Sequence, residues 1–423
     1  MVRNQISTLN METKYKRTPI GDLPVDWEVL KLKQIADVRR GASPRPIGDP
    51  KYFGDGPGWV RISDITRSVK YLRKTEQQLS EIGVKCSVSV KPGDIIMSIC
   101  ATIGKPIIVD MNACIHDGFV LFENLSKDIS KDYLYYYLQS YENTFSNQGQ
   151  PGSQKNINTS IVGDSYIPVP KYGEQVKIGT ILASIDSVLE ISSAVIEKTK
   201  QLKKGLMQQL LTRGIGHKEF KNTPIGKIPK EWKVMQLEEV SDIYGGGTPD
   251  RTNIKYWDGN ISWATPTDIT SLKTNHINTT KERISEEGLK NSSATLIQEG
   301  GVLMTSRATI GYCAINTVPM TTNQGFANFV CHKEMNNQFL VYLLTAIRTK
   351  IERLGAGSTF MEVSKSALKK LLIQVPSIPE QEEIVRIISS LDESIEKENI
   401  YHQSVLQLKS TLMQLLLTGR IRV

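Results

Sequence analysis

The side chains of this sequence that are suited to chemistry are mostly cationic, amide and hydroxyl groups in turn-rich segments. Such groups can read nucleic acid, because Arg and Lys pair with guanine, Asn and Gln pair with adenine, and hydroxyls and amides bind phosphates. Each could instead be solvated surface, so the hypothesis depends on the set and on its repetition. The candidate DNA contacts are Arg39, Arg40, Ser43, Arg45, Arg61, Ser63, Lys105, Thr248, Arg251, Thr265, Thr267, Arg307, Asn323 and Gln324.

These candidates fall in short segments that occur in pairs. Residues 39–45 form a loop punctuated by Gly and Pro, and residues 248–251 lie in the corresponding later loop. Residues 61–64 alternate polar and apolar side chains, which predicts a strand with one face toward a ligand, and 265–268 is their counterpart. Loops on a shared framework are where variable specificity is placed.

Catalytic motifs are missing from the sequence. There is no G-x-x-x-x-G-K-[ST] phosphate loop, no G-x-S-x-G nucleophile motif and no Asn/Asp-Pro-Pro-Tyr motif of amino-methyltransferases. Gly245–Gly247 is followed by Thr-Pro and does not fit a dinucleotide fingerprint. Asp64 and Asp268 repeat, but their setting suits a turn or a helix cap at least as well as a general base. We therefore expect no catalytic residue in this chain.

Cysteine and histidine spacing predicts neither a metal site nor a disulfide framework. The five cysteines are odd in number and form no C-x-x-C pair, and the five histidines form no H-E-x-x-H motif. A reduced, cytoplasmic location is therefore expected. The residues are Cys86, Cys100, Cys114, Cys313 and Cys331, and His116, His217, His276, His332 and His402.

Size and composition indicate a soluble protein of two or more domains. The 423 residues exceed one ordinary core, and 39% are hydrophobic and 23% charged. The sequence contains no run of 18 apolar residues, so we expect no membrane span. Residues 1–17 are expected to be a polar leader and not a secretory signal. The net charge of +8 is in the direction that a polyanion partner requires.

The sequence contains one long internal repeat. Thr18–Gly21 returns 205 residues later as Thr223–Gly226, and Leu206–Gln208 returns 206 residues later as Leu412–Gln414. The matching motifs occur in the same order in both copies, and their separation varies by only a few residues along the chain. The two copies therefore share a framework and differ in their loops. The period is too long for a solenoid, whose repeats span about 20–50 residues. It indicates a duplicated domain for two similar ligands or two parts of one ligand. Further pairs are Trp27 and Trp232, Trp59 and Trp263, and Ala101–Gly104 and Ala308–Gly311.

Within each copy the first three-quarters is predicted to mix strands and helices. Apolar runs at 95–99, 106–109 and 119–122 are separated by turn signals and are typical of strands. Helices are predicted at 131–141 and at 337–354.

The last quarter of each copy has a heptad pattern that predicts a long helix. Apolar residues follow three- and four-residue steps over nearly forty residues, which favours pairing of the two helices in a coiled coil. The alternative is that each helix packs only on its own domain. Ser377–Glu380 resembles a capping box with proline in the first turn. The predicted seam residues include Ile178, Ile185, Leu202, Leu206, Ile384, Leu391, Leu408 and Leu412.

Taken together, these motifs resemble the specificity subunits of type I restriction-modification enzymes. The resemblance rests on Thr-Pro-Ile-Gly-x-x-Pro-x-x-Trp opening each copy, on Val-Pro before Glu-Gln, and on Leu-Met-Gln-x-Leu-Leu-Thr near each helix end. It extends from about Thr18 to Thr418. It implies an α+β fold with two tandem, pseudo-symmetric, β-rich target-recognition domains separated by two long helices that form an antiparallel coiled coil.

The resemblance also implies boundaries and partners. Target-recognition domains at 18–171 and 223–377 would each read one half of a split, asymmetric site in double-stranded DNA. Spacer helices at 172–212 and 378–418 would dock two methyltransferase subunits, with a join at 213–222 and a tail at 419–423. Restriction subunits would join outside them. S-adenosylmethionine, ATP and Mg²⁺ are expected in those partners, and no cofactor or metal in this chain.

The chain departs from the family pattern where Ser-Arg-Gly-Thr-Ile-Gly is common. The second copy has Ser306–Thr309 with Ala308 for glycine, and the first copy has Cys100 where the arginine would stand. The first copy also has His116-Asp117 where the second copy has Asn323-Gln324, so a DNA role for Cys100, His116 and Asp117 is doubtful. Three alternatives stay open: a single-chain DNA endonuclease or nickase, a protein-binding adaptor, and the specificity subunit of a related restriction system without an ATP-driven motor.

Overall fold

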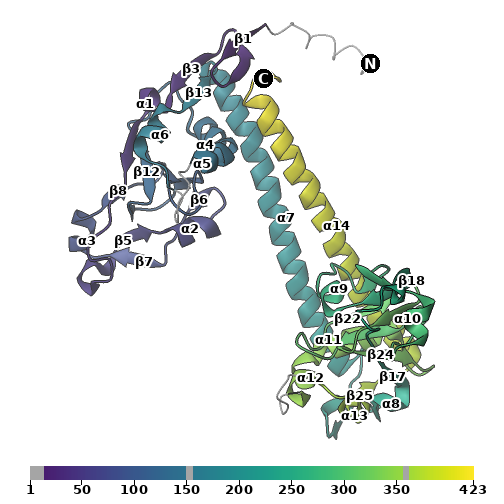
Figure 1. Ribbon diagram of the computed structural model, residues 1–423. Helices are drawn as coiled ribbons and strands as arrows, with labels where there is room; N and C mark the ends of the chain where they lie inside the picture. The colour runs from purple at the N-terminus through teal and green to yellow at the C-terminus, as the bar shows by residue number, and fades with distance from the viewer. Residues whose placement is uncertain (1–13, 149–155, 356–361) are drawn as a thin grey trace, which may run out of the picture. The chain divides into compact units, whose positions relative to one another are not determined.

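The computed structural model of the protein describes residues 14–148, 156–355 and 362–423 (Figure 1). The chain forms two compact units: unit 1 contains residues 1–192 and 401–423, and unit 2 contains residues 193–400. Each unit therefore combines one β-rich copy with one end of each long helix. Residues 1–13 of the expected leader lie outside the described residues, whereas Tyr15–Thr18 already forms strand β1.

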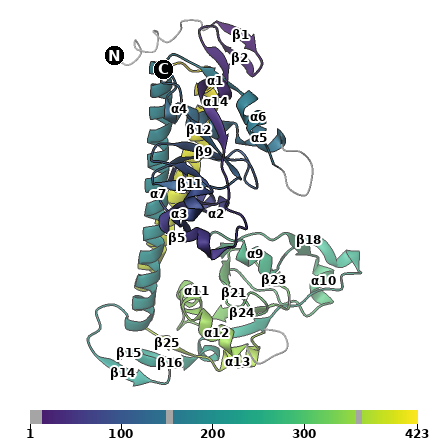
Figure 2. The same ribbon diagram turned by 90° about the vertical axis from the view of Figure 1, so that its left-hand side faces the viewer.

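Unit 1 is built on two mixed sheets, and two smaller strand pairs stand beside them. A five-stranded sheet has the order β4-β12-β9-β10-β6, and a four-stranded sheet has the order β7-β5-β11-β8. Figure 2 labels β12 and β9 of the first sheet and β11 and β5 of the second. The strands are β1 (Tyr15–Thr18), β2 (Gly21–Pro24), β3 (Glu28–Lys31), β4 (Asp37–Arg40), β5 (Phe53–Val60), β6 (Tyr71–Leu72), β7 (Gln77–Leu79), β8 (Val88–Val90), β9 (Ile95–Ser98), β10 (Pro106–Val109), β11 (Ala113–Ile115), β12 (Phe119–Glu123) and β13 (Tyr166–Val169).

Unit 2 repeats this topology. Its five-stranded sheet has the order β17-β24-β21-β22-β19, and a three-stranded sheet has the order β20-β18-β23. In both units the last pair of the large sheet is parallel and the others are antiparallel. The duplication inferred from sequence is thus a duplication of fold. The strands are β14 (Phe220–Thr223), β15 (Gly226–Pro229), β16 (Lys233–Gln236), β17 (Ser241–Gly245), β18 (Trp257–Ala264), β19 (His276–Ile277), β20 (Glu282–Ile284), β21 (Val302–Thr305), β22 (Cys313–Asn316), β23 (Met320–Thr322), β24 (Phe326–Cys331) and β25 (Leu372–Val375).

Helices complete both units. The helix predicted at 131–141 is α4, and the one predicted at 337–354 is interrupted at Ile347, so α11 and α12 replace it. The helices of unit 1 are α1 (Leu32–Ile35), α2 (Ile62–Arg67), α3 (Glu81–Lys85), α4 (Lys131–Ser140), α5 (Glu142–Gln148) and α6 (Thr159–Asp164). Those of unit 2 are α8 (Leu237–Val240), α9 (Pro266–Thr270), α10 (Glu286–Lys290), α11 (Asn337–Ala346), α12 (Arg348–Leu354) and α13 (Lys365–Lys369). The long helices are α7 (Tyr172–Arg213) and α14 (Ile378–Leu416).

The segments expected to be strands at 61–64 and 265–268 are instead the starts of short helices. Arg61 and Thr265 precede α2 and α9, and the carboxylates of Asp64 and Asp268 accept hydrogen bonds from the backbone nitrogens of these two residues, each at 2.8 Å. The polar–apolar alternation was misleading because a carboxylate three residues into the segment caps a helix turn. The prediction that Asp64 and Asp268 suit a cap is confirmed.

The ends of the long helices pack into the domain cores. In unit 1, Ile178 and Leu182 of α7 share one apolar cluster with Leu416 of α14 and Tyr133 of α4. In unit 2, Leu210 and Leu211 of α7 share a cluster with Ile384 and Ile388 of α14. In each unit the helices therefore contact both the β-rich domain and each other. By length and composition α7 would be able to cross a membrane; some of its apolar side chains are buried in these cores, whereas others, such as Ile191 and Leu202, are exposed.

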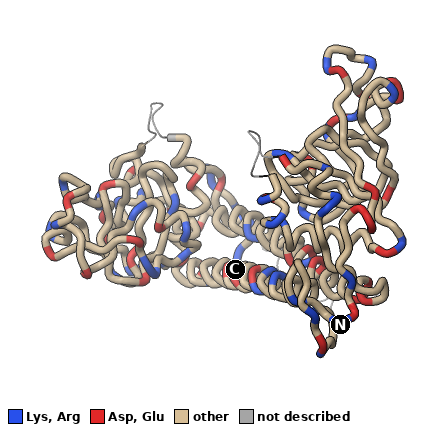
Figure 3. Tube along the Cα trace, turned by 90° about the horizontal axis from the view of Figure 1, so that it is seen from below, with Lys and Arg blue, Asp and Glu red and all other residues tan. Residues whose placement is uncertain are grey.

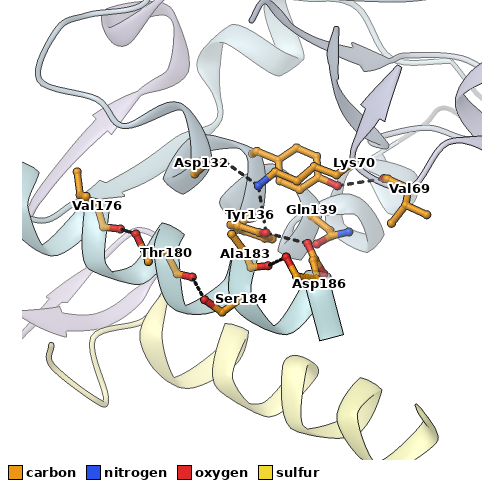
Figure 4. Close-up of polar contacts among 12 residues, drawn as sticks. Val69, Lys70, Asp132, Tyr136, Gln139, Val176, Thr180, Ala183, Ser184 and Asp186 are labelled. Carbon is orange, nitrogen blue, oxygen red and sulfur yellow. Dashed lines mark hydrogen bonds and ion pairs between the residues drawn. The ribbon is translucent and has the colours of Figure 1, made fainter. Parts of the chain in front are cut away.

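A repeated Tyr–Asp–Lys cluster joins helix to helix and helix to domain. In unit 1, Asp186 of α7 lies 2.7 Å from Nζ of Lys409 of α14. Its other oxygen accepts a 2.7 Å hydrogen bond from the Tyr136 hydroxyl of α4 (Figure 4). Lys70 adds a 2.7 Å ion pair to Asp132 and a 3.2 Å hydrogen bond to the same hydroxyl. Burial, and then the carboxylate of Asp186, raises the pKa of Tyr136, so the phenol stays protonated.

Unit 2 contains the same cluster with the helices exchanged. Asp392 of α14 pairs with Lys203 of α7 and accepts a 2.8 Å hydrogen bond from the Tyr342 hydroxyl of α11. Each member lies 206 residues from its equivalent, so the long helices run antiparallel within both units. The predicted antiparallel pairing is confirmed there.

The seam residues were predicted partly in the wrong frame. Leu202 and Leu408 are 54% and 51% exposed, whereas the neighbouring Lys203 and Lys409 are directed inward to their aspartates. A search for apolar residues alone does not find these charged seam positions. In addition, a straight α-helix has 3.6 residues per turn, so its inward face shifts away from a strict heptad pattern along the helix. Glu380 also differs from the capping-box prediction, because its carboxylate accepts hydrogen bonds from the Trp232 indole at 2.9 Å and from the Ile215 backbone at 3.1 Å.

Candidate nucleic-acid interface

In unit 1 three predicted DNA contacts converge on one residue, Asp117. Its oxygens accept hydrogen bonds from Ser43 Oγ at 2.7 Å and from Arg45 Nη2 at 2.9 Å, and its backbone carbonyl accepts one from Arg40 Nε at 2.8 Å. The loops after β4 and before β12 are thereby tied together, and Gly41 N also donates to the Phe119 carbonyl at 2.9 Å. The Arg45 side chain remains 67% exposed, so this network holds the guanidinium in place while leaving it accessible.

The electrostatics of this network favour a charged Asp117. Burial raises the pKa of Asp117, but the hydrogen bond from Ser43 and the charge of Arg45 outweigh it, and the pKa lies below its ordinary value. Burial lowers the pKa of the neighbouring His116, which favours its neutral form. His116 Nδ1 accepts a 2.7 Å hydrogen bond from Gly118 N. His116 and Asp117 therefore shape the loop that carries the arginines.

The other candidates of unit 1 are less closely grouped. Arg39 forms a 3.5 Å ion pair with Glu123 on the adjacent strand. Arg61 lies over the Trp59 ring at 5.5 Å and donates to Gln77 at 3.1 Å, and Ser63 lies in the first turn of α2. Lys105 is half-buried near Glu142 of α5, and burial lowers its pKa. It does not join the Asp117 network.

Unit 2 holds its corresponding arginine on a pair of tryptophans. The Arg251 guanidinium lies 3.9 Å from the centre of the Trp257 ring and 4.8 Å from that of Trp263, and it forms a two-pronged ion pair with Glu282. The Trp263 indole donates to the Gly247 carbonyl at 2.8 Å. Stacking and ion pairing together pre-orient a guanidinium that is still half exposed.

Four loops of unit 2 meet at one edge of the domain. Backbone hydrogen bonds join Gly247 to Thr322 at 2.9 Å, Asn323 to Ala264 at 3.0 Å and Ser306 to Gly325 at 2.7 Å. The structure thus brings together most of the predicted contacts of this copy. Thr248 donates to Gln324, Asn323 accepts from Gly325 N, Thr265 Oγ1 donates to Asp268, and Thr267 is exposed in the first turn of α9.

Arg307 is positioned by a tight turn that both copies share. Ala308 and its counterpart Ala101 have φ of +57°, a left-handed conformation that alanine rarely adopts. In each copy the hydroxyl at the strand end, Ser98 or Thr305, donates to the carbonyl four residues on and closes the turn. Arg307 then forms a 2.8 Å ion pair with Glu362 and remains 46% exposed.

Sequence reasoning missed the residues that hold these contacts. Asp117 was judged doubtful for a DNA role because it replaces the Asn-Gln of the second copy, yet it organises three predicted contacts. Trp257 and Glu282 were not singled out at all. The repeated aromatic pair, Phe53 with Trp59 and Trp257 with Trp263, was the available signal.

The arrangement is suited to recognition by hydrogen bonds and charge. Lys and Arg are interleaved with Asp and Glu along the trace of each unit (Figure 3). Within residues 14–148, 156–355 and 362–423, no group of three or more His, Cys, Asp and Glu side chains could hold a metal ion. In each unit, neighbouring carboxylates and rings hold exposed arginines, amides and hydroxyls in place, which makes these groups a candidate binding surface.

Comparison with known proteins agrees with a duplicated DNA-reading protein. The family described as "Type I restriction modification DNA specificity domain" matches residues 24–201 and 229–403. The MjaVIII specificity subunit of a type I restriction enzyme from Methanocaldococcus jannaschii is 26% identical over 422 residues, covering 95% of this chain and 94% of the relative. The MjaIX subunit from the same organism is 38% identical over 180 residues, 42% of each chain. The crystal structure of a type I S subunit from M. genitalium has 14% identity and a TM-score of 0.56, covering 92% of this chain and 96% of that one.

The protein therefore belongs to the class of DNA specificity proteins that contain two copies of one domain. The chain is a member of the type I restriction-modification DNA specificity family, as the resemblance predicted. Members of this family are specificity subunits and are not themselves catalytic, because catalysis lies in other subunits. The endonuclease alternative is thereby set aside.

Proposed function

We propose that this chain reads a bipartite, asymmetric site in double-stranded DNA, with the loops of each unit contacting one half-site. One observation carries the proposal: a shared framework presents two different sets of base-reading groups. In unit 1 the set is centred on Arg40 and Arg45 held by Asp117, and in unit 2 on Arg251 held by tryptophans and on Arg307. Different donors and acceptors favour different base pairs, so the half-sites differ.

The catalytic work belongs to partners in this proposal. Two methyltransferase subunits carrying S-adenosylmethionine dock on the long helices and methylate adenine, and restriction subunits using ATP and Mg²⁺ join outside them. This chain binds none of these cofactors. The assembly acts in the cytoplasm, where the DNA is. The duplicated helix ends support a partner present in two copies.

The decisive experiment maps methylated adenines across the genome of a strain with and without this chain. Exchanging residues 230–375 with those of a relative should change one half of the methylated site and leave the other half intact. A change in both halves, or in neither, contradicts the assignment of one half-site to each unit. The purified chain alone should neither cleave nor methylate DNA.

Arg307 gives a finer test within unit 2. Arg307→Ala should cost about 1–3 kcal/mol on the recognised half-site if the guanidinium makes a two-pronged contact with a base. An equal loss of binding free energy on every DNA sequence would identify a phosphate contact instead. The measurement is competition binding with variant half-sites at fixed salt concentration.

A second candidate is the specificity subunit of a related restriction system without an ATP-driven motor. The DNA-reading units are the same in both cases. DNA-dependent ATP hydrolysis by the purified assembly would favour the type I system, and cleavage without ATP would favour the alternative.

A further inference from the structure

One turn occurs in both units directly after a buried strand. In unit 1, β11 ends at Ile115 and His116 follows it, and in unit 2, β23 ends at Thr322 and Asn323 follows it. Each of these strands pairs in parallel with the long strand of its smaller sheet, β5 or β18. The two side chains are 207 positions apart in the sequence and leave their sheets at the same point, so they occupy equivalent places.

The same hydrogen bond fixes both side chains. His116 Nδ1 accepts from the backbone nitrogen of Gly118 at 2.7 Å, and Asn323 Oδ1 accepts from that of Gly325 at 2.9 Å. A Cβ at Gly118 would lie 2.2 Å from His116 Cε1, and one at Gly325 would lie 3.0 Å from Asn323 Oδ1. Glycine two positions further on therefore leaves the room in which each side chain folds back on its own backbone.

The next residue is tied to the preceding loop in both units. Ser43 Oγ donates to Asp117 Oδ1 at 2.7 Å, and Thr248 Oγ1 donates to Gln324 Oε1. The two copies thus have different side chains at both positions of the turn and keep the same two hydrogen bonds. A geometry that is kept while the side chains differ indicates that the direction of the side chains is what matters.

These hydrogen bonds determine where His116 carries its proton. Because Nδ1 accepts the hydrogen of Gly118, the ring proton of the neutral imidazole lies on Nε2. Burial lowers the pKa of His116, which favours this neutral form. Asp117 Oδ1 lies 3.6 Å from Nδ1, which is too far for a hydrogen bond that would hold the proton there.

One donor on each side chain is left for a ligand. Within residues 14–148, 156–355 and 362–423, neither His116 Nε2 nor Asn323 Nδ2 forms a hydrogen bond. Neither nitrogen is one of the buried polar atoms that lack a partner, so solvent reaches both. Each turn therefore presents a fixed donor, while the acceptor of the same side chain is bound to the backbone.

The turn lies beside the exposed arginines of each unit. In unit 1 the residue after His116 is Asp117, which holds Arg45 at 2.9 Å. In unit 2 a Cβ at Gly325 would lie 3.8 Å from Cβ of Arg307. The fixed donors thus belong to the same loop surfaces as the candidate base-reading arginines.

A donor without an accompanying acceptor selects one kind of base. On the major-groove edge guanine presents O6 and thymine presents O4, whereas adenine and cytosine present an amino group there. A free asparagine amide would pair with adenine through both its oxygen and its nitrogen, but the Asn323 oxygen is already bound to Gly325. An amino group would direct its hydrogens at the donor, so the turn favours a keto base, guanine or thymine, and opposes an amino base.

We propose that His116 and Asn323 are equivalent specificity-determining residues, each donating one hydrogen bond to a keto oxygen, O6 of guanine or O4 of thymine, in its half-site. The inference rests on the proposed function and adds the class of base that is read at one position of each half-site. It differs from the expectation based on sequence, which made a DNA role for His116 doubtful and paired asparagine with adenine.

The test in unit 2 replaces the donor with an acceptor and keeps the turn. In Asn323→Asp, Oδ1 still accepts from Gly325, and a second oxygen takes the place of the amide nitrogen. The full chain, assembled with the methyltransferase subunit encoded beside it, is assayed by competition binding to duplexes in which each base pair of the mapped site is replaced in turn. At one position the wild type should prefer a keto base on the contacted strand about tenfold, and the variant should prefer adenine or cytosine there.

A matched control separates base reading from charge. The added negative charge of Asn323→Asp weakens binding to all DNA, so the ratio of affinities for keto and amino bases is the readout. Asn278→Asp makes the same chemical change on an exposed side chain just after β19, away from the turn, and should leave this ratio unaltered. An unaltered ratio in Asn323→Asp as well would overturn the proposal for unit 2.

The test in unit 1 exchanges the side chains of the two copies. His116→Asn transfers the unit 2 donor into unit 1 and should keep the preference for a keto base, whereas His116→Asp should reverse it. The imidazole also packs between the rings of Trp59 and Phe119. If packing were its only role, both variants would weaken binding to every base equally, and that result would overturn the proposal for unit 1.

A measurement on the wild-type chain does not depend on any variant folding correctly. The nitrogen chemical shifts of a histidine ring distinguish a proton on Nε2 from one on Nδ1, and His116 should carry its proton on Nε2. A proton on Nδ1 would overturn the fixed donor. An assembly of the wild-type chain that binds DNA without any sequence preference would instead overturn the proposed function.

Discussion

Lys409→Met should destabilise unit 1 far more than Lys203→Met destabilises unit 2, although the two lysines occupy equivalent positions. Lys409 and Asp186 have side-chain exposures of 11% and 8%, whereas Lys203 and Asp392 have 21% and 35%. Removing Lys409 therefore leaves a buried carboxylate with only the Tyr136 hydroxyl as a described side-chain partner.

The magnitudes follow from this difference in burial. Removing one partner of a buried ion pair costs about 3–5 kcal/mol, and the hydrogen bond that Asp186 keeps from the Tyr136 hydroxyl places Lys409→Met near the lower end of that range. Water reaches Asp392, so Lys203→Met should cost about 1 kcal/mol. A difference of about 2 kcal/mol corresponds to roughly a thirtyfold difference in opening equilibria.

Hydrogen exchange read by mass spectrometry measures each unit separately. The peptides to compare cover α4 in unit 1 and α11 in unit 2, which carry Tyr136 and Tyr342. The double variant Asp186→Leu/Lys409→Met should recover most of the loss, because no unpaired charge remains and only the Tyr136 hydroxyl loses an acceptor. Equal effects of the two single variants, or a double variant as unstable as Lys409→Met, would refute the reasoning.

Three further predictions concern the loops and the helices. Asp117→Asn should reduce discrimination by unit 1 by about 1 kcal/mol, since Arg45 loses its ion pair, and competition binding should show the other half-site unaffected. Ala308→Gly should stabilise the chain toward urea by up to about 1 kcal/mol by relieving the left-handed alanine; a loss would contradict the strain. Inserting one heptad after Val195 and one after Tyr401 lengthens each helix by about 10 Å, so methylation mapping should show a longer spacer between unchanged half-sites. An active variant that keeps the original spacer would show that the helices do not set the distance between the half-sites.

Long-range features of the fold were predictable because they depend on patterns that extend over many residues. The duplication, both long helices and the strands at 95–98, 106–109 and 119–123 follow from repeated motifs and from sustained apolar periodicity. Short segments were less predictable. Residues 61–64 were predicted to be a strand from their polar and apolar pattern, yet Asp64 caps a helix, because a local hydrogen bond decides the structure of a segment of one or two turns.

The candidate interface was predictable in its chemistry but not in its organisation. Arg45, Arg251 and Arg307 were identified from residue type and loop position, whereas the groups that orient them come from distant parts of the chain. Asp117 lies 72 residues from Arg45, and Glu282 lies 31 residues from Arg251. Such partners become neighbours only through the sheet pairing, which a single sequence does not specify.

The last residues of the chain have a consequence for how the protein is made. Arg422 pairs with Glu174 at 2.6 Å and with Asp26 at 2.7 Å, and Leu416 and Leu417 lie in the core of unit 1. His217, with Glu380, occupies the equivalent place in unit 2. Because unit 2 comprises residues 193–400, the ribosome has supplied all of it before the closing segment of unit 1 is synthesised. Although most of unit 1 is translated before unit 2, its core is therefore completed only after unit 2 has been synthesised, and until then it lacks the leucines that fill it.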